Sequence, residues 1–247
     1  MNCDGTNVQW NTIMTTKDDV VKFLQKNGVE TRFVSIMDGK VYINNLRLSK
    51  FSRRKEEIFL EKFPDYEVRR SQVFQKICTR ASRVLKTALN PHDKILLSDS
   101  PNCVNLILRT VLEPYTRKYG VELIIIPELD FSQMEVQNTD GEKQKVDAVA
   151  LPFTMDEEVE HILGLMIHGE ELKLLSSENE LNGLRMIYPL INVPISWVES
   201  MVEIETLNCI FKNENGHPRE MLEFLESFIP DVREKMMRSA DYLSGDE

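Results

Sequence analysis

Cysteine is scarce in this chain. The 247 residues contain four cysteines, Cys3, Cys78, Cys103 and Cys209, and no two of them form a CxxC pair. A disulfide framework is recognised by organised cysteine spacings, so the sequence predicts reduced thiols rather than disulfide bonds. A structural zinc site would need four ligands gathered from distant segments, with only four histidines to help. The sequence therefore predicts no bound metal.

Long apolar runs are also absent. No stretch approaches the roughly 18 consecutive apolar residues that a membrane-spanning helix needs. The N-terminus, MNCDGTNVQWNTIMTTKDD, has neither the basic start nor the apolar stretch of a secretory signal. Hydrophobic residues still make up 42% of the chain, which is enough for a sizeable core. We therefore expect a soluble, cytoplasmic protein with no membrane partner.

Positive charge is in short supply, since the net charge is −10. That balance argues against a dedicated nucleic-acid binder. The distribution is uneven, however: residues 47–86 hold twelve Lys and Arg against five Asp and Glu, and residues 87–247 carry a net −17. The basic segment supplies candidate contacts to RNA phosphates at Arg53, Arg54, Lys55, Arg69, Arg70, Arg80 and Arg83. The alternative interpretation is a solvated helical face.

The first third of the sequence predicts a small α+β segment. A capping threonine, Thr16, precedes apolar residues at helical spacing and predicts a helix. Asp38-Gly39 lies between two β-rich runs and predicts a hairpin. Residues 49–63 and 68–89 have helical periodicity and predict two further helices.

From residue 91 the pattern changes to alternating strands and helices. Apolar runs at 94–98, 121–130 and 145–153 predict buried strands, and this alternation is typical of a parallel sheet with crossover helices. The chain ends in two predicted helices with an apolar stripe that is expected in the core, namely Phe224, Leu225, Phe228 and Ile229. We place the domain boundary at residue 90, with a basic appendage over 1–90 and the main α/β domain over 91–247.

Open parallel sheets bind ligands at the carboxyl ends of their strands, so the loop after the first strand of this domain is the first candidate site. It reads Ser98-Asp99-Ser100-Pro101-Asn102-Cys103. Its placement resembles the PP-loop of ATP pyrophosphatases, SGGxDS, where glycines let backbone N–H groups close around pyrophosphate. Here Asp99 and Ser100 replace both glycines, and the Asp99 carboxylate repels a polyanion. The alternative is an ordinary strand-to-helix turn with capping residues.

Three later segments extend the resemblance in the family's order and spacing. Residues 152–169 resemble its helix with paired acids and place Asp156 and Glu157 at positions that belong to the nucleotide site. Residues 188–194 resemble its "KPL" segment, and residues 218–243 are similar to its closing helices. The two acids have an alternative role, because carboxylates stabilise the N-terminus of any helix.

Pro101 is similar to the SGGPSS variant of cytoplasmic tRNA 2-thiolation protein 2, the partner subunit of the wobble-uridine thiolase. The resemblance implies an adenine nucleotide alpha hydrolase-like fold with a degenerate nucleotide site and no cofactor. It also implies a non-catalytic subunit that forms a heterodimer with a catalytic PP-loop thiolase subunit and meets tRNA through that complex. The family's N-terminal zinc module with CxxC pairs is missing, and residues 28–62 are a candidate for its metal-free remnant.

Cys209 falls where the family's catalytic thiolases place one reactive cysteine. The other reactive cysteine has no counterpart, and a thiol relay needs a partner thiol or an activating base. We therefore predict a structural role for Cys209, with catalysis as the weaker alternative. Two other functions stay open: a divergent ATP-dependent thiolase that adenylates its substrate, and an α/β interaction module without an RNA role.

Overall fold

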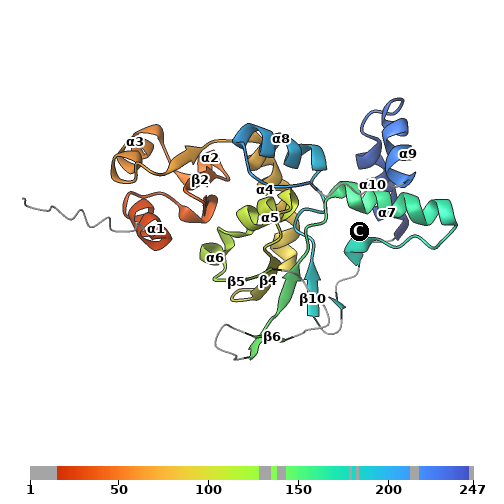
Figure 1. The fold of residues 1–247 in the computed structure, drawn as a ribbon, viewed down its shortest axis with the longest axis horizontal. Coiled ribbons are helices and arrows are strands. Elements are labelled where there is room, and N and C mark those ends of the chain that lie inside the picture. The colour runs from red at the N-terminus through yellow and green to blue at the C-terminus, as the bar shows by residue number, and fades with distance from the viewer. Residues whose placement is uncertain are drawn as a thin grey trace, which may run out of the picture.

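The computed structural model describes residues 16–127, 135–137, 143–177, 180–181, 184–211 and 217–244. In this part of the chain, an N-terminal segment with its own small sheet precedes a parallel sheet covered by helices (Figure 1). The predicted fold class, an α/β domain with a parallel sheet and an N-terminal α+β appendage, is confirmed. None of the described helices is long and apolar enough to cross a membrane.

The N-terminal segment follows its local sequence signals. Thr16 and Asp19 form a capping box at the start of the first helix, and Asp38 (φ 47°) and Gly39 (φ 70°) adopt the left-handed conformation that a two-residue hairpin requires. The elements are α1 (Lys17–Lys26), η1 (Thr31–Phe33), β1 (Val34–Met37), β2 (Lys40–Ile43), α2 (Leu46–Ser49), α3 (Arg53–Lys62) and β3 (Glu67–Arg69).

An aromatic cluster forms the core of this segment. Phe59 of α3 is fully buried, and its ring centroid lies 6.0 Å from that of Phe51, 5.1 Å from that of Phe63 and 6.0 Å from that of Tyr66. Aromatic pairs at such distances add stabilisation beyond the area they bury. The N-terminal segment therefore has a core separate from that of the main sheet.

Two predicted boundaries in this segment were wrong. The helix predicted over 49–63 is interrupted, because Lys50 adopts a left-handed conformation (φ 53°) between α2 and α3. The helix predicted over 68–89 begins at Gln72, after the Ser71 cap, because β3 pairs in parallel with β2. A three-residue strand at the end of a helical pattern has no periodicity of its own, so the sequence did not reveal it.

The helix α4 (Gln72–Ala88) packs on the main sheet rather than on the N-terminal core. Its buried face, which includes Phe74, Ile77 and Leu85, belongs to the same cluster as the strand residues Ile95 and Leu97. The predicted boundary at residue 90 therefore separates α4 from the sheet that it covers.

The main sheet has the strand order β5-β4-β8-β10-β9. The first four strands are parallel, and β9 joins the edge antiparallel. The strands are β4 (Lys94–Ser98), β5 (Glu122–Ile126), β8 (Ala148–Ala150), β9 (Glu180–Leu181) and β10 (Leu184–Ile187), and a separate hairpin joins β6 (Glu135–Gln137) to β7 (Lys143–Lys145). Because the parallel strands run the same way, the loops that follow them meet at one edge.

Both faces of the central strands β4 and β8 are buried, so these strands read as continuous apolar runs. Along β4, Ile95 and Leu97 contact the cluster beneath one layer of helices, and Leu96 contacts the cluster beneath the other. One layer contains α4, α5 (Cys103–Leu112), α6 (Tyr115–Lys118) and α8 (Ile195–Glu205), and the other contains α7 (Met155–His168), η2 (Leu175–Ser177), α9 (His217–Glu226) and α10 (Val232–Ser244).

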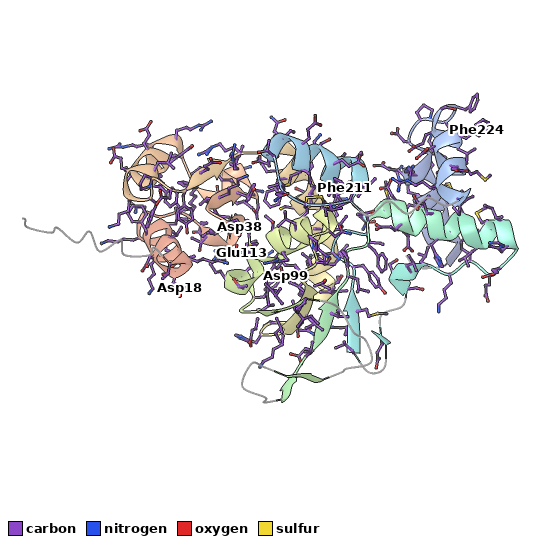
Figure 2. All side chains as sticks on the ribbon, in the orientation of Figure 1. Asp18, Asp38, Asp99, Glu113, Phe211 and Phe224 are labelled. Carbon is purple, nitrogen blue, oxygen red and sulfur yellow. A yellow bond between two sulfur atoms is a disulfide. The ribbon has the colours of Figure 1, made fainter. Side chains whose placement is uncertain are left out.

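Glu113 joins the N-terminal segment to the main domain (Figure 2). This buried carboxylate accepts a hydrogen bond from the Ile36 backbone N–H of β1 at 3.1 Å. It also pairs with Lys17 of α1 and with Arg117, each at 2.5 Å. One carboxylate thus ties α1, β1 and the end of α5 together.

The apolar stripe predicted in the core of the closing helices is largely exposed, so that prediction was wrong. Phe224 is 63% exposed, Phe228 71% and Ile229 40%, and Leu225 is half-buried. Among the side chains of α9 that the structure describes, only Leu222 belongs to the core beneath α7 and α10. Figure 2 shows Phe224 on α9, at the opposite end of the molecule from the N-terminal segment.

Candidate functional site

The candidate site lies in the loop that joins β4 to α5. Asp99 follows the last residue of β4, and Asn102 caps α5 by accepting a hydrogen bond from the Val104 N–H at 2.7 Å. A helix N-terminus directed at the carboxyl edge of a parallel sheet is the arrangement that binds phosphate in many α/β proteins. The predicted position of the loop is therefore confirmed, and its chemistry depends on which donors are free.

Three backbone donors of the loop, the N–H groups of Asp99, Ser100 and Cys103, are already engaged within the protein. The Asp99 N–H donates to the Ile126 carbonyl of β5 at 2.6 Å, and the Ser100 N–H donates to the Ser98 hydroxyl at 3.1 Å. The Cys103 N–H donates to the Ile210 carbonyl at 3.1 Å. An anion at this loop would have to displace these bonds before it could use the same donors.

The side chains that replace the two glycines also have partners. Asp99 pairs with Arg109 of α5, and Ser100 accepts a hydrogen bond from the Asn105 side chain. The Arg109 guanidinium compensates part of the Asp99 charge, so the repulsion expected from Asp99 alone is reduced. The same ion pair positions both side chains beside the loop, where Figure 2 shows Asp99.

Cys103 and Cys209 form a disulfide, which corrects the prediction of unpaired thiols. The bridge joins residues 106 positions apart, with a Cα–Cα distance of 5.0 Å. Backbone hydrogen bonds flank it, because the Ile210 N–H donates to the Pro101 carbonyl at 2.9 Å in addition to the bond from Cys103 to Ile210. The prediction that Cys209 lacks a partner thiol was therefore wrong. No local pattern could have shown this pair, since its members belong to different segments that only the fold brings together.

The acids of α7 make local contacts. Asp156 accepts a hydrogen bond from the Ile195 N–H of α8 at 2.6 Å and pairs with Arg233 of α10 at 3.0 Å. Glu157 reaches back to the Thr154 N–H at 2.6 Å and completes a capping box. Burial raises the pKa of both carboxyls, and these hydrogen bonds oppose the rise. The contacts support the alternative interpretation, in which the acids organise the helix N-terminus and join α7 to α8 and α10.

Four of the seven basic candidates for RNA contact are held by the protein itself. Arg80 donates to the Asn192 carbonyl at 2.9 Å, pairs with Glu234 at 2.6 Å and lies 4.4 Å from the centroid of the Trp197 ring. The other three pairings are Arg70 with Glu56, Arg69 with Glu67 and Glu205, and Lys55 with the carbonyls of Gly28 and Lys50.

The remaining three candidates are exposed. Arg54 and Arg83 are exposed on α3 and α4, and Arg53 keeps a 75% exposed side chain although it pairs with Glu56. Arg54 and Arg83 can reach a phosphate without breaking any ion pair described here, whereas Arg53 would have to exchange its exposed pair with Glu56. The RNA-binding role of the segment stays a prediction, and these three residues are the ones to test.

The chain is similar to known proteins over part of its sequence and over most of its fold. No protein-family model matches the chain. A probable sulfurtransferase of Methanocaldococcus jannaschii is 30% identical over 96 residues, which are 38% of this chain and 28% of that protein. The chain thus matches less than a third of the length of that curated relative.

A solved structure extends the likeness to most of the fold. The U34-tRNA thiolase NcsA from Methanococcus maripaludis, solved with its 4Fe–4S cluster, is 14% identical and superposes with a TM-score of 0.50. The match covers 71% of this chain and 80% of that one. The chain therefore shares its α/β fold with that structure, which agrees with the predicted fold class.

The cysteines described here do not fit the iron–sulfur cluster of that neighbour. Such clusters are held by sets of cysteine thiolates. Cys103 and Cys209 are bonded to each other, Cys78 packs against the core of the sheet, and Cys3 lies outside the described residues. Over the described ranges, no three His, Cys, Asp or Glu side chains converge on a possible metal position. We derive no chemistry through a cluster.

Proposed function

We propose that this protein is a non-catalytic subunit of a complex that 2-thiolates the wobble uridine of tRNA. In this proposal it stabilises a catalytic PP-loop paralogue, which binds ATP and carries the reactive cysteines. The exposed guanidinium groups of Arg53, Arg54 and Arg83 add to the binding of tRNA phosphates. The chain acts in the cytoplasm, where it meets both the paralogue and tRNA.

The internal hydrogen bonds of the β4–α5 loop are the observation that carries the proposal. A working PP-loop presents free N–H groups to pyrophosphate. Here the N–H groups of Asp99, Ser100 and Cys103 are bonded to Ile126, Ser98 and Ile210. ATP would have to break these bonds and accept the Asp99 carboxylate nearby, which costs affinity at each step. The thiolase-like fold and the sulfurtransferase relative support a role in thiolation, and the bonded loop favours a role as the partner of an active subunit.

Calorimetry with ATP tests the loop. The purified full chain should show no heat of binding with ATP at millimolar concentration, whether the Cys103–Cys209 bridge is oxidised or reduced. Reduction leaves the bonds of Asp99 and Ser100 in place, so it should not create a site. Micromolar affinity that disappears in Ser98→Trp would overturn the proposal and favour an enzyme. A PP-loop protein with intact glycines serves as the positive control.

Co-purification tests the partner. The full chain, isolated from its native source, should bring down a PP-loop paralogue that carries both loop glycines and reactive cysteines, identified by mass spectrometry. Recovery of partners without any PP-loop protein would favour the interaction module without an RNA role. Glu203→Gln serves as a control in the same co-purification. Glu203 is exposed and its substitution leaves every contact of the loop unchanged, so this variant should recover the same partners.

A divergent thiolase is the second candidate, and the proximity of Cys103 to Cys209 favours it. Two thiols at a PP-loop supply the partner that a thiol relay needs. We expect Cys209→Ser to leave the 2-thiouridine content of cellular tRNA almost unchanged, with Cys78→Ser as control. Loss of 2-thiouridine at normal protein abundance, in Cys209→Ser and in Cys103→Ser alike, would establish the catalytic alternative.

A further inference from the structure

The two sulfur atoms of the Cys103–Cys209 bridge lie in different surroundings. Cys103 is fully buried at the start of α5. Cys209 is half-buried, and its neighbour Ile210 is 66% exposed. Thiol–disulfide exchange depends on which sulfur an incoming thiolate can reach. Access therefore favours attack at Sγ of Cys209.

Cys103 is the first residue of a ten-residue helix, where the helix dipole stabilises negative charge. Its full burial disfavours a thiolate, so the helix start offsets that cost only in part. The direction of attack therefore follows from access to Cys209.

We infer that the Cys103–Cys209 bridge is a thiol-exchange site for a small thiol such as glutathione. A thiolate RS⁻ attacks Sγ of Cys209, the S–S bond breaks, and its electron pair leaves with Cys103 as a thiolate. The product is a mixed disulfide between Cys209 and R. A second RS⁻ then attacks the sulfur of R, which releases RSSR and the Cys209 thiolate. Overall, two RSH molecules reduce the bridge to two thiols and are oxidised to one RSSR.

Reduction of this bridge removes the covalent link between the β4–α5 loop and the segment that follows α8. In the oxidised protein, residues 209–210 are held against Pro101 and Cys103 by the bridge and by two backbone hydrogen bonds of 2.9 and 3.1 Å. After reduction only the two hydrogen bonds remain, and they lie beside the exposed Ile210 side chain. The bridge is therefore a reversible covalent link between the β4–α5 loop and the segment that follows α8. This inference does not depend on the proposed function, since the chemistry is the same in a subunit and in an enzyme.

Trapping the mixed disulfide tests the direction of attack. Two variants, Cys103→Ser and Cys209→Ser, are each made in full-length protein that also carries Cys3→Ser. Each variant is incubated with oxidised glutathione, and the modified cysteines are identified by mass spectrometry of peptides. In Cys103→Ser, the Cys209 thiolate should form a stable mixed disulfide, because no second thiol resolves it. In Cys209→Ser, the buried Cys103 should stay unmodified. Equal modification of both cysteines, or modification of Cys103 alone, overturns the inference. The control is Cys78→Ser, since burial raises the pKa of the Cys78 thiol and keeps it unreactive.

Two measurements on the chain with its bridge intact keep the inference testable if a serine variant fails to fold. Millimolar glutathione should reduce the bridge without denaturant. Hydrogen exchange at the Ile210 and Cys103 amides should then accelerate on the order of tenfold, with no change at amides in β4. A bridge that is reduced only after unfolding, or equal exchange rates in both redox forms, would show a purely structural disulfide.

Discussion

Phenylalanine is buried in the N-terminal segment and exposed in helix α9, although both segments carry it at helical spacing. Phe59 of α3 is fully buried among other rings. Phe224 of α9 and Phe228, which follows that helix, have ring centroids 5.0 Å apart and are more than half exposed. Arginine behaves in the opposite way. Arg80, expected on a polar face, is enclosed by Trp197 and Glu234.

The contrast comes from the number of neighbouring elements. The cluster around α3 draws residues from α1, β1 and β2, so one helix face is covered from several sides. The helix α9 packs against α7 and α10 through Leu222, and nothing in the described part of the chain covers its other face. The type of side chain thus favours either burial or exposure, and the neighbouring elements determine whether the side chain is actually buried.

The largest expected difference is between the two phenylalanines. Phe59→Ala removes a fully buried ring and should lower the free energy of unfolding by about 3–5 kcal/mol. Phe224→Ala removes a ring whose described contacts are mainly with Phe228, so its cost should be about 1 kcal/mol or less. Urea unfolding of both variants measures the difference. Similar costs would mean that the exposed face of α9 is covered in the folded protein.

The two arginines of α4 should differ by a smaller amount. Arg80→Gln removes the ion pair with Glu234 and the cation–π interaction with Trp197, so we expect the free energy of unfolding to fall by about 1–3 kcal/mol. Arg83→Gln, on the exposed face of the same helix, should stay within about 0.5 kcal/mol of the original chain. Thermal and urea unfolding can be compared directly, because both substitutions are chemically identical. A neutral Arg80→Gln would restore the interpretation of the basic segment as a solvated face.

The free energy of unfolding should depend on pH through the partly buried acids of α7 but not through exposed acids. Burial raises the pKa of Glu157 above its ordinary value of 4.5 in the folded protein. As the pH falls from 7 towards 4.5, the folded state therefore binds a proton before the unfolded state does, and this stabilises the fold. Glu157→Gln keeps a capping oxygen but does not titrate. The original chain should gain stability relative to the variant over this range, and the difference should level off below pH 4.5.

Urea unfolding at several pH values measures that difference, with the exposed Glu203→Gln as control. A loss of stability of the original chain relative to Glu157→Gln as the pH falls would mean that Thr154 and the helix N-terminus outweigh burial at this carboxyl.

The smallest expected effect concerns the exposed arginines and rests on the proposed contact with tRNA. In the complex, changing Arg53, Arg54 and Arg83 to Gln should reduce the slope of log affinity against log salt by about 0.7–0.9 for each phosphate that the protein no longer neutralises. Arg69 and Arg70 are left out because their paired side chains are partly buried, whereas the side chain of Arg53 is 75% exposed. Glu203→Gln should leave the slope unchanged. An unaltered slope in the triple variant would assign tRNA binding to the partner subunit.

Features with local signals could be predicted from the sequence. The Thr16 cap, the Asp38-Gly39 hairpin and the apolar run of β4 each depend on a few neighbouring residues, and each was predicted correctly. The longer strands and helices after residue 91 follow from the same kind of signal, whereas the short strands β6, β7 and β9 were not predicted. The position of the β4–α5 loop could be predicted as well, because it is fixed by the strand before it and the helix after it.

Features that depend on distant residues could not be predicted. The partner of Cys103 is 106 residues away, and Asp156 finds Arg233 only when α7 and α10 pack together. The strand β3 was missed since its three residues gain their structure from pairing with β2. Such features depend on tertiary contacts, which override local propensity.

Glu113 has a consequence for the order in which the chain folds during synthesis. Its carboxylate satisfies the Ile36 N–H of β1 across 77 residues of sequence. A chain that leaves the ribosome N-terminus first therefore presents β1 with an open donor until the end of α5 has emerged. Until then the small sheet has an uncovered edge, which is the kind of surface that pairs with other strands. The N-terminal segment, although it is made first and has its own aromatic core, is completed by a residue of the domain that follows it.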